Sequence, residues 1–307
     1  MGYNSRSGKT GVKGSHWEGQ LMDSRGPLED VPKAAADLVN SPYKVWYEDF
    51  DEVFADNQME LMGWTVTDLG TATSPSNVVL GANRALLINP GTKADSGTMC
   101  QFNIRGNAGA LGNMHKVMPE IVDVATTFDG VEQFFQVRLG HVATTAATND
   151  NKWMVGIFTT DASAISPTTA LPTLSAGGFG FHKGETGAVT CLSTSAAITA
   201  AGTACVPAVN HYALTTDATI EWHTYAARIR VIDASAETGV ADFWVDGVHR
   251  LRIADSLPHD ATDTMAFTIG VLNGPATVNI TDMYVDYILT GITRPGLTWP
   301  YTNGVIY

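Results

Sequence analysis

Apolar and polar residues alternate along much of the segment EWHTYAARIRVIDASAETGVADFWVDGVHRLRI, residues 221–253, which is punctuated by an acidic loop and an Asp-Gly turn. A two-residue period places successive side chains on opposite faces of a β-strand, so the pattern predicts strands with one buried face. Phe243 and Trp244 are predicted to point to opposite faces. Asp246-Gly247 is a favoured dipeptide for a tight hairpin turn, because both central residues need a positive φ. The segment therefore predicts three consecutive antiparallel strands.

Two neighbouring strands with matching alternation bury one face and leave the other free for a ligand or a neighbouring subunit. The first strand is predicted to bury Tyr225, Ala227, Ile229 and Val231. The polar residues of this strand are expected along its edges, and they are His223, Thr224, Arg228 and Arg230. We predict that the face that binds a ligand or a partner carries Trp222, Arg228, Arg230 and Trp244.

The same alternation recurs from residue 43 onward and predicts roughly a dozen strands, with almost no convincing helix. Besides the segment above, the predicted strands lie within residues 45–50, 63–70, 84–90, 97–104, 120–128, 132–141, 152–160, 177–184, 188–196, 265–273 and 277–292. Residues 51–61 look helical. We predict an all-β fold, a two-sheet antiparallel sandwich, over residues 43–292.

Residues 1–42 are predicted to form an extended arm, because they are rich in Gly, Ser and charge and almost lack apolar periodicity. Residues 293–307 are predicted to be a proline-broken, aromatic tail packed on the surface or on a neighbour. The arm is expected to be mobile in isolation and to be held by neighbouring subunits. Its predicted assembly residues are Arg6, Lys9, Lys13, Trp17 and Arg25.

The formal charge of −13 lies outside this arm, since residues 1–40 hold five basic and five acidic side chains. A basic tip on an acidic body is expected of an arm that docks onto an acidic neighbour, and equally of a plain disordered leader. The acidic body lacks the cations that phosphate contacts need, so nucleic acid is not an expected partner. Only 16% of residues are charged, which suits a protein that packs against neighbours.

The sequence predicts neither a membrane span nor a secretion signal. No apolar run approaches the ~20 residues needed to cross a bilayer. The N-terminus MGYNSRSGKTGVKG has no hydrophobic segment, so it is not expected to be a secretion signal. Three cysteines cannot form a disulfide framework, and reduced, buried thiols are expected. Pairing of Cys191 with Cys205 across the small-residue loop between them stays open.

The order Trp222-His223-Thr224-Tyr225, followed by an alternating strand and FWVDG, resembles concanavalin A-like lectin/glucanase domains. In that family both strands belong to an antiparallel jelly roll. The segments WMVGIFTTDAS and GGFGFHKGETG are similar to uncharacterised virion proteins of tailed bacteriophages that use this sandwich. The resemblance covers residues 43–292 and implies a jelly roll, but the family spans hydrolases, lectins and structural proteins.

A glycoside hydrolase of this fold needs two carboxylates on one face, about 5 Å apart in a retaining enzyme. The glucanase-type members carry a Glu-x-Asp-x-x-Glu strand. Here the nearest pair is Glu120 and Asp123, which face opposite sides of a strand, and the third carboxylate is missing. The run Glu48–Glu52 permits a pair but lies on the first strand. We therefore predict no catalytic residues and no enzyme activity.

Acidic segments could supply oxygen ligands for Ca²⁺, but acidic loops are usually solvated turns. Candidates are the DFDE run, Asp260, Asp263, Asn279 and Asp282. No Cys/His spacing supports zinc, so no cofactor is predicted, with structural calcium as the alternative. A sugar site would use exposed aromatic rings. Strand tryptophans are more often core residues, and Trp244 is the exception among Trp64, Trp153, Trp222, Trp244 and Trp299.

Together these features favour a non-enzymatic structural protein of a bacteriophage virion. We predict a capsid decoration or cement protein, made in the host cytoplasm and assembled into the particle. Its expected partners are the major capsid protein and copies of itself, with no membrane or nucleic acid. The alternative is a carbohydrate-binding adhesin on the virion surface, in a head fibre or tail component, which recognises host glycans.

Overall fold

The computed structural model describes residues 43–50, 58–70, 77–80, 85–91, 95–103, 132–143, 151–159, 165, 177–184, 188–194, 203–206, 220–233, 238–254, 265–274 and 281–293. These residues lie almost entirely in strands of two antiparallel sheets, here sheet A and sheet B. The helix among them, α3 (Gln58–Leu61), is one turn long and falls where a helical segment is predicted. The predicted arm and nearly all of the predicted tail lie outside the described residues.

Sheet A runs in the order β13-β12-β11-β6-β15-β4-β3, and β1 also pairs with β15. The first four strands of this order are β13 (Val248–Ala254), β12 (Thr238–Val245), β11 (Glu221–Asp233) and β6 (Glu132–Ala143). The remaining strands are β15 (Thr281–Thr293), β4 (Leu86–Asn89), β3 (Asn77–Leu80) and β1 (Tyr43–Glu48).

Sheet B runs in the order β10-β9-β8-β7-β14-β5-β2. Its strands are β10 (Thr203–Ala204), β9 (Thr190–Thr194), β8 (Gly178–Lys183), β7 (Lys152–Thr159), β14 (Met265–Leu272), β5 (Ser96–Asn103) and β2 (Trp64–Gly70). Several neighbours in both sheets are far apart in the chain, as with β6 between β11 and β15.

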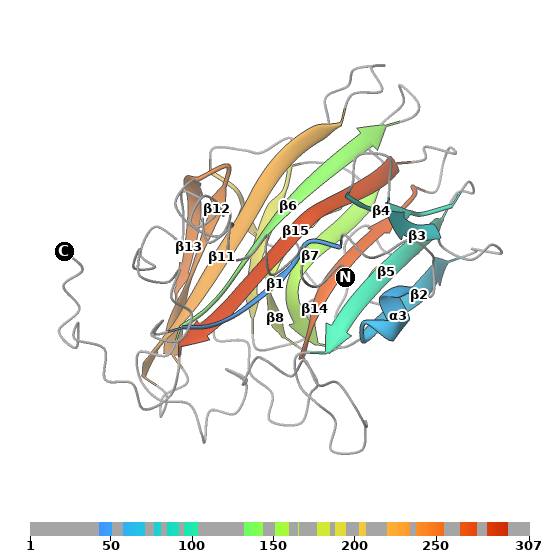
Figure 1. The fold of residues 1–307 in the computed structure, drawn as a ribbon. Coiled ribbons are helices and arrows are strands. Elements are labelled where there is room, and N and C mark those ends of the chain that lie inside the picture. The colour runs from blue at the N-terminus through green and yellow to red at the C-terminus, as the bar shows by residue number, and fades with distance from the viewer. Residues whose placement is uncertain are drawn as a thin grey trace.

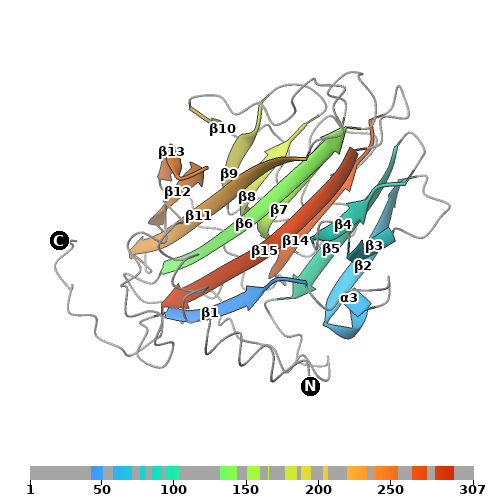
Figure 2. The ribbon, with the colours of Figure 1, turned by 45° about the horizontal axis from the view of Figure 1, so that its top comes forward.

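The two sheets lie face to face, with β11, β6 and β15 as long neighbouring strands in front of β7 and β14 (Figures 1 and 2). Antiparallel pairing of strands distant in sequence within two stacked sheets is the arrangement of a jelly-roll sandwich. The predicted all-β class, a two-sheet antiparallel sandwich, is therefore confirmed over the described residues, and the predicted N-terminal arm lies outside them.

The core between the sheets is built from the inward side chains of each strand. Phe181 of β8 is fully buried and packs with its ring centroid 5.1–6.3 Å from three rings of sheet A. These rings are Phe135, Tyr225 and Phe243, from the neighbouring strands β6, β11 and β12. Edge-to-face packing of this kind adds to the burial of apolar area.

The turn between β12 and β13 also agrees with its prediction. Asp246 and Gly247 have φ values of 52° and 74°, the left-handed conformation that a two-residue hairpin turn requires. In the run Glu48–Glu52, strand β1 ends at Glu48 and Phe50 has a φ of 55°, so the strand predicted over residues 45–50 ends two residues early. Residues 51 and 52 lie outside the described residues. The strands β3 and β10 were not predicted, because both are short.

Replacing Phe181 with Ala should destabilise the fold strongly, because the cavity would lie between three aromatic rings of the opposite sheet. We expect the free energy of unfolding to fall by about 3–5 kcal/mol, measured by urea denaturation. Val248→Ala, at a side chain that is 48% exposed, is the control and should change it by about 0.5 kcal/mol or less. A loss for Phe181→Ala as small as that of the control would contradict this packing.

Candidate functional site

The predicted partner-binding residues lie on the outer face of sheet A, which points away from sheet B. On β11 the inner residues Tyr225, Ala227 and Ile229 are fully buried, so Trp222, Arg228 and Arg230 belong to the opposite face. Trp244 of β12 lies opposite Ala226 of β11, on the same outer face. These four residues therefore lie on one outer face of sheet A, and their role in binding stays a prediction.

The first group on this face joins residues of three strands. Trp222 lies opposite Gly140 of β6, where a Cβ would come within 2.9 Å of the indole, so glycine makes room for the ring. The guanidinium of Arg138 lies over the Trp222 ring, 4.9 Å from its centroid. Arg138 Nη1 also donates a hydrogen bond to Asp286 Oδ2 at 2.8 Å. We call Trp222, Arg138 and Asp286 the first triplet.

The second group repeats this arrangement on β11 and β12. The guanidinium of Arg228 lies over the Trp244 ring, 5.6 Å from its centroid, and Arg228 Nη2 is 3.9 Å from Asp242 Oδ2. We call Trp244, Arg228 and Asp242 the second triplet. In both triplets a guanidinium contacts an indole ring on one side and a carboxylate on another. Each cation–π contact contributes about 0.5–1 kcal/mol when exposed.

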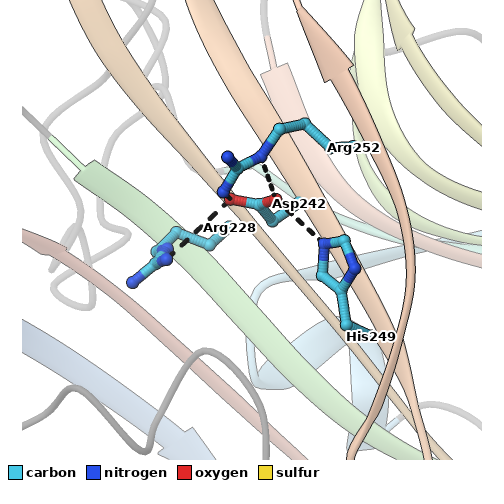
Figure 3. A network of polar contacts seen from close by, with 4 residues as sticks. All are labelled: Arg228, Asp242, His249 and Arg252. Carbon is cyan, nitrogen blue, oxygen red and sulfur yellow. Dashed lines mark hydrogen bonds and ion pairs between the residues drawn. The ribbon is translucent and has the colours of Figure 1, made fainter.

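Asp242 is the centre of a larger polar network, shown in Figure 3. Arg252 of β13 donates from Nε to Oδ1 at 2.7 Å and from Nη2 to Oδ2 at 3.0 Å, a bidentate pair. His249 Nε2 lies 3.0 Å from Oδ1. Only 6% of the Asp242 side chain is exposed, against 58% for Arg252. The network is therefore a nearly buried carboxylate covered by cationic groups that reach the surface.

The pKa of Asp242 reflects this environment. Burial alone would raise it, but hydrogen bonds from Arg252 and His249, with the charges of Arg252 and Arg228, outweigh burial and lower the pKa below its ordinary value. The carboxylate is thus ionised at neutral pH. With Arg228 and Arg252 beside a single anion, the network carries a net positive charge on a chain of net charge −13.

Two details of the predicted face need correction. The face is not free throughout, since its residues Phe134, Gln136 and Ala226 are buried. Arg228 and Arg230 are not on a strand edge either, because β11 is flanked by β12 and β6. Other contributors were not predicted, namely Arg138, Asp286, His249 and Arg252. Their positions depend on strand pairing that alternation within one strand does not reveal.

His223 lies at the end of β11 between two carboxylates. Its Nδ1 is 2.6 Å from Asp246 Oδ2, and its Nε2 is 3.2 Å from Glu221 Oε1. Burial alone lowers the pKa of His223, but the hydrogen bonds and charges of Asp246 and Glu221 outweigh burial and raise it. Asp246 also accepts a hydrogen bond from the Thr224 N–H. Because both ring nitrogens are engaged, the imidazole ties the hairpin turn to β11.

The tryptophans considered as sugar platforms fall into two classes. Trp64 and Trp153 are 3% and 0% exposed and belong to the core, so they cannot offer a ring to a ligand. Trp222 and Trp244 are half-buried on the outer face, but each carries a guanidinium over its ring. Trp299 lies outside the described residues.

Metal and catalytic candidates fall largely outside the described part of the chain. Glu120, Asp123, Asp260, Asp263 and Asn279 are among those not described. Within the described ranges, no group of three or more His, Cys, Asp or Glu side chains is arranged to hold a metal ion. In those ranges there is also no helix with the length and apolar character to span a bilayer.

Comparison with known proteins finds similarity at the level of the fold. No family model matches the sequence, and no curated protein matches it. Among similar solved structures is the carbohydrate recognition domain of Emp46p in a potassium-bound form, with a TM-score of 0.46 and 8% identity over 79% of this chain and 94% of that one.

Two solved enzyme structures are similar to a comparable extent. Alginate lyase Aly36B has a TM-score of 0.47 and 10% identity over 80% of this chain and 96% of that one. An endo-1,3-beta-glucanase from Streptomyces sioyaensis has a TM-score of 0.46 and 14% identity over 83% and 98% of the two chains. At these identities the likeness concerns the fold alone, and no activity follows from it.

Asp242→Asn should destabilise the sandwich, because it leaves Arg228 and Arg252 without their common anion. We expect a loss of about 2 kcal/mol at pH 7, measured by urea denaturation. The pKa of Asp242 is lower in the folded state, so its contribution is present above its unfolded value of about 3.9 and is lost as pH falls through the folded pKa. A variant as stable as the wild type at pH 7 would contradict the network.

His223→Gln should change the pH dependence of stability. The folded pKa of His223 is raised, so its ionic contribution is present below the unfolded value of about 6.5 and is lost as pH rises through the folded pKa. The difference in free energy of unfolding between wild type and variant should therefore be larger at pH 6 than at pH 9.

Asp246→Asn is the matched variant, because it keeps the turn residue's tolerance of positive φ and removes the main anion at His223. It should lose a pH-dependent contribution over the same window. Differences from the wild type that are equal at pH 6 and pH 9, in both variants, would show that folding does not raise the pKa of His223.

Proposed function

We propose that the chain is a non-enzymatic structural protein of a bacteriophage particle, a capsid decoration or cement protein. In this proposal the outer face of sheet A, around the two triplets, binds neighbouring protein subunits. We propose a virus particle because residues 153–163 and 177–187 resemble virion proteins of this sandwich type. The binding face comes from the contacts of the described residues.

The observation that carries the proposal is the pair of Trp–Arg–Asp triplets. Arg and Trp are enriched in protein–protein interfaces and at the residues that dominate binding energy. Each guanidinium is already held by an indole and a carboxylate, so less side-chain entropy is lost when a partner binds. The positive network at Asp242 would favour an acidic partner surface, such as the body of another copy of this chain.

An adhesin that binds glycans is the second candidate. Trp244 supports it, because the ring lies on the outer face beside the polar side chains of His249 and Arg228. A sugar that stacks on an aromatic ring needs an open ring face, however, and Arg228 already lies over this one. A flat protein surface can use the guanidinium and the indole together, so we favour a protein partner.

The proposal of no enzyme activity rests on two observations. The strand that carries the catalytic carboxylates in glucanase-type relatives has no complete counterpart in the sequence, where Glu120 and Asp123 are the nearest pair. The described histidine with two carboxylate neighbours, His223, has both ring nitrogens occupied. Both nitrogens therefore point at carboxylates of the chain, and neither is directed at a position for a substrate, as a general base requires.

Replacing Trp222 and Trp244 together with Ala should abolish association of the full chain with other subunits. We expect the wild type to form a defined oligomer in light scattering, and the double variant to remain monomeric at the same concentration. Val206→Ala is the control, since Val206 is 65% exposed, follows β10 of sheet B and belongs to neither triplet. It should associate as the wild type does.

A glycan array with the same proteins separates the two candidates. If the wild type is monomeric and binds glycans, and if Trp244→Ala alone abolishes that binding, the protein is an adhesin and not a structural protein. An oligomer that persists in the double variant would show that subunits meet through another surface, such as the arm with Arg6, Lys9 and Lys13. Either result would overturn the proposed binding face.

A further inference from the structure

Two cysteine thiols meet in the core at the edge of sheet B. Cys191 lies in β9, and Cys205 directly follows the two-residue strand β10. Their Sγ atoms are 3.3 Å apart, and both thiols are free. The two residues are 0% and 2% exposed and belong to the same core cluster. Both side chains therefore point between the sheets.

The backbone already holds the two cysteines in place. Cys191 is paired with Thr203 in the β9–β10 ladder, and the Cys205 N–H donates to the Val189 carbonyl at 3.2 Å. A disulfide bond is about 2.05 Å long, so the sulfur atoms would have to approach by little more than 1 Å. Side-chain rotation can supply that movement without a change of strand register.

The two thiols differ in reactivity. The hydrogen bond with Cys191 lowers the pKa of Cys205, burial opposes this, and the charge of Arg250 lowers it further. The same hydrogen bond and burial raise the pKa of Cys191. Burial also raises the pKa of Cys100, to about 12. Cys205 is thus the thiol that ionises first, and the thiolate is the reactive form.

The position of Cys205 also gives it access to small oxidants. Its neighbours Thr203, Ala204 and Val206 are all exposed, and β10 is a two-residue strand at the edge of sheet B. Short edge segments with few buried contacts open locally at low cost in free energy. Cys100, by contrast, lies in β5, between β14 and β2.

From this geometry we infer that Cys191 and Cys205 are a peroxide-sensitive dithiol that closes to an intramolecular disulfide. In the first step the Cys205 thiolate attacks hydrogen peroxide, which gives a sulfenic acid at Cys205 and releases hydroxide. In the second step the Cys191 thiol attacks the Cys205 sulfur, the S–S bond forms, and the sulfenic oxygen leaves as water. Overall, two thiols are oxidised to a disulfide and one hydrogen peroxide is reduced to two molecules of water. One of these waters forms when the hydroxide of the first step takes up the proton that the Cys205 thiol lost on ionisation.

The disulfide would fasten a contact between the two sheets. Next to Cys205, the Val206 N–H donates to the Arg250 carbonyl of β13 at 3.1 Å, which joins the edge of sheet B to the edge of sheet A. Strand β13 also carries His249 and Arg252 of the network at Asp242. Oxidation would thus restrain the segment at Cys205 and Val206, and through the Val206–Arg250 hydrogen bond it would restrain β13. The inference does not depend on the proposed function.

The test treats the reduced full chain with hydrogen peroxide, then denatures it and counts thiols by alkylation and intact mass. We expect the wild type to retain one alkylatable thiol, Cys100, and peptide mapping to find the Cys191–Cys205 crosslink. Dithiothreitol should restore all three. Cys100→Ala should still form the crosslink, and Cys205→Ala should form no intramolecular disulfide. The oxidised wild type should have a Tm several degrees above that of the reduced protein.

Three results would overturn the inference. One is that all three thiols remain alkylatable after peroxide treatment that oxidises exposed methionines. Another is a disulfide that links two chains or contains Cys100. The third is that Cys191 is oxidised at least as fast as Cys205, seen when dimedone traps a sulfenic acid at Cys191 in Cys205→Ala at a rate no lower than at Cys205 in Cys191→Ala.

Discussion

Phe181 of sheet B packs among Phe135, Tyr225 and Phe243, which are inward side chains of three neighbouring strands of sheet A. This contact fixes the register of β6, β11 and β12, because a slip of one residue would turn every inward side chain outward. Once these rings are buried, the alternate residues of the same strands must lie on the outer face. The positions of Trp222, Arg228 and Trp244 therefore follow from the core behind them.

Alternation within single strands predicted the sandwich and the common face of Trp222, Arg228, Arg230 and Trp244. It failed where strands depart from strict alternation. The register of β15 against β6 shifts between Val285 and Tyr287, so Asp286 is an extra residue beside Arg138. The register of β12 against β13 shifts between Phe243 and Trp244, which brings His249 opposite Trp244. Bulges of this kind redirect side chains, and their location depends on strand pairs distant in sequence.

The first triplet draws on one of these irregularities and on long-range strand pairing. Arg138 reaches Trp222 because β6 lies beside β11, and it reaches Asp286 because β15 lies on the other side of β6. The resulting face carries aromatic rings that are already covered by cations. Such a face is better suited to a protein surface than to a stacked sugar. The shared sandwich fold does not decide between these partners, whereas the contacts of the indole rings bear on the choice directly.

Hydroxyl-radical footprinting of the full chain, dilute and then associated with other copies, tests the central claim most directly. Oxidation is quantified at Trp222 and Trp244 by mass spectrometry, with Val206 as the reference on sheet B. If the outer face of sheet A binds protein, oxidation of both tryptophans should fall several-fold on association while that of Val206 is unchanged. Equal oxidation of Trp222 and Trp244 in the free and associated protein would contradict the claim.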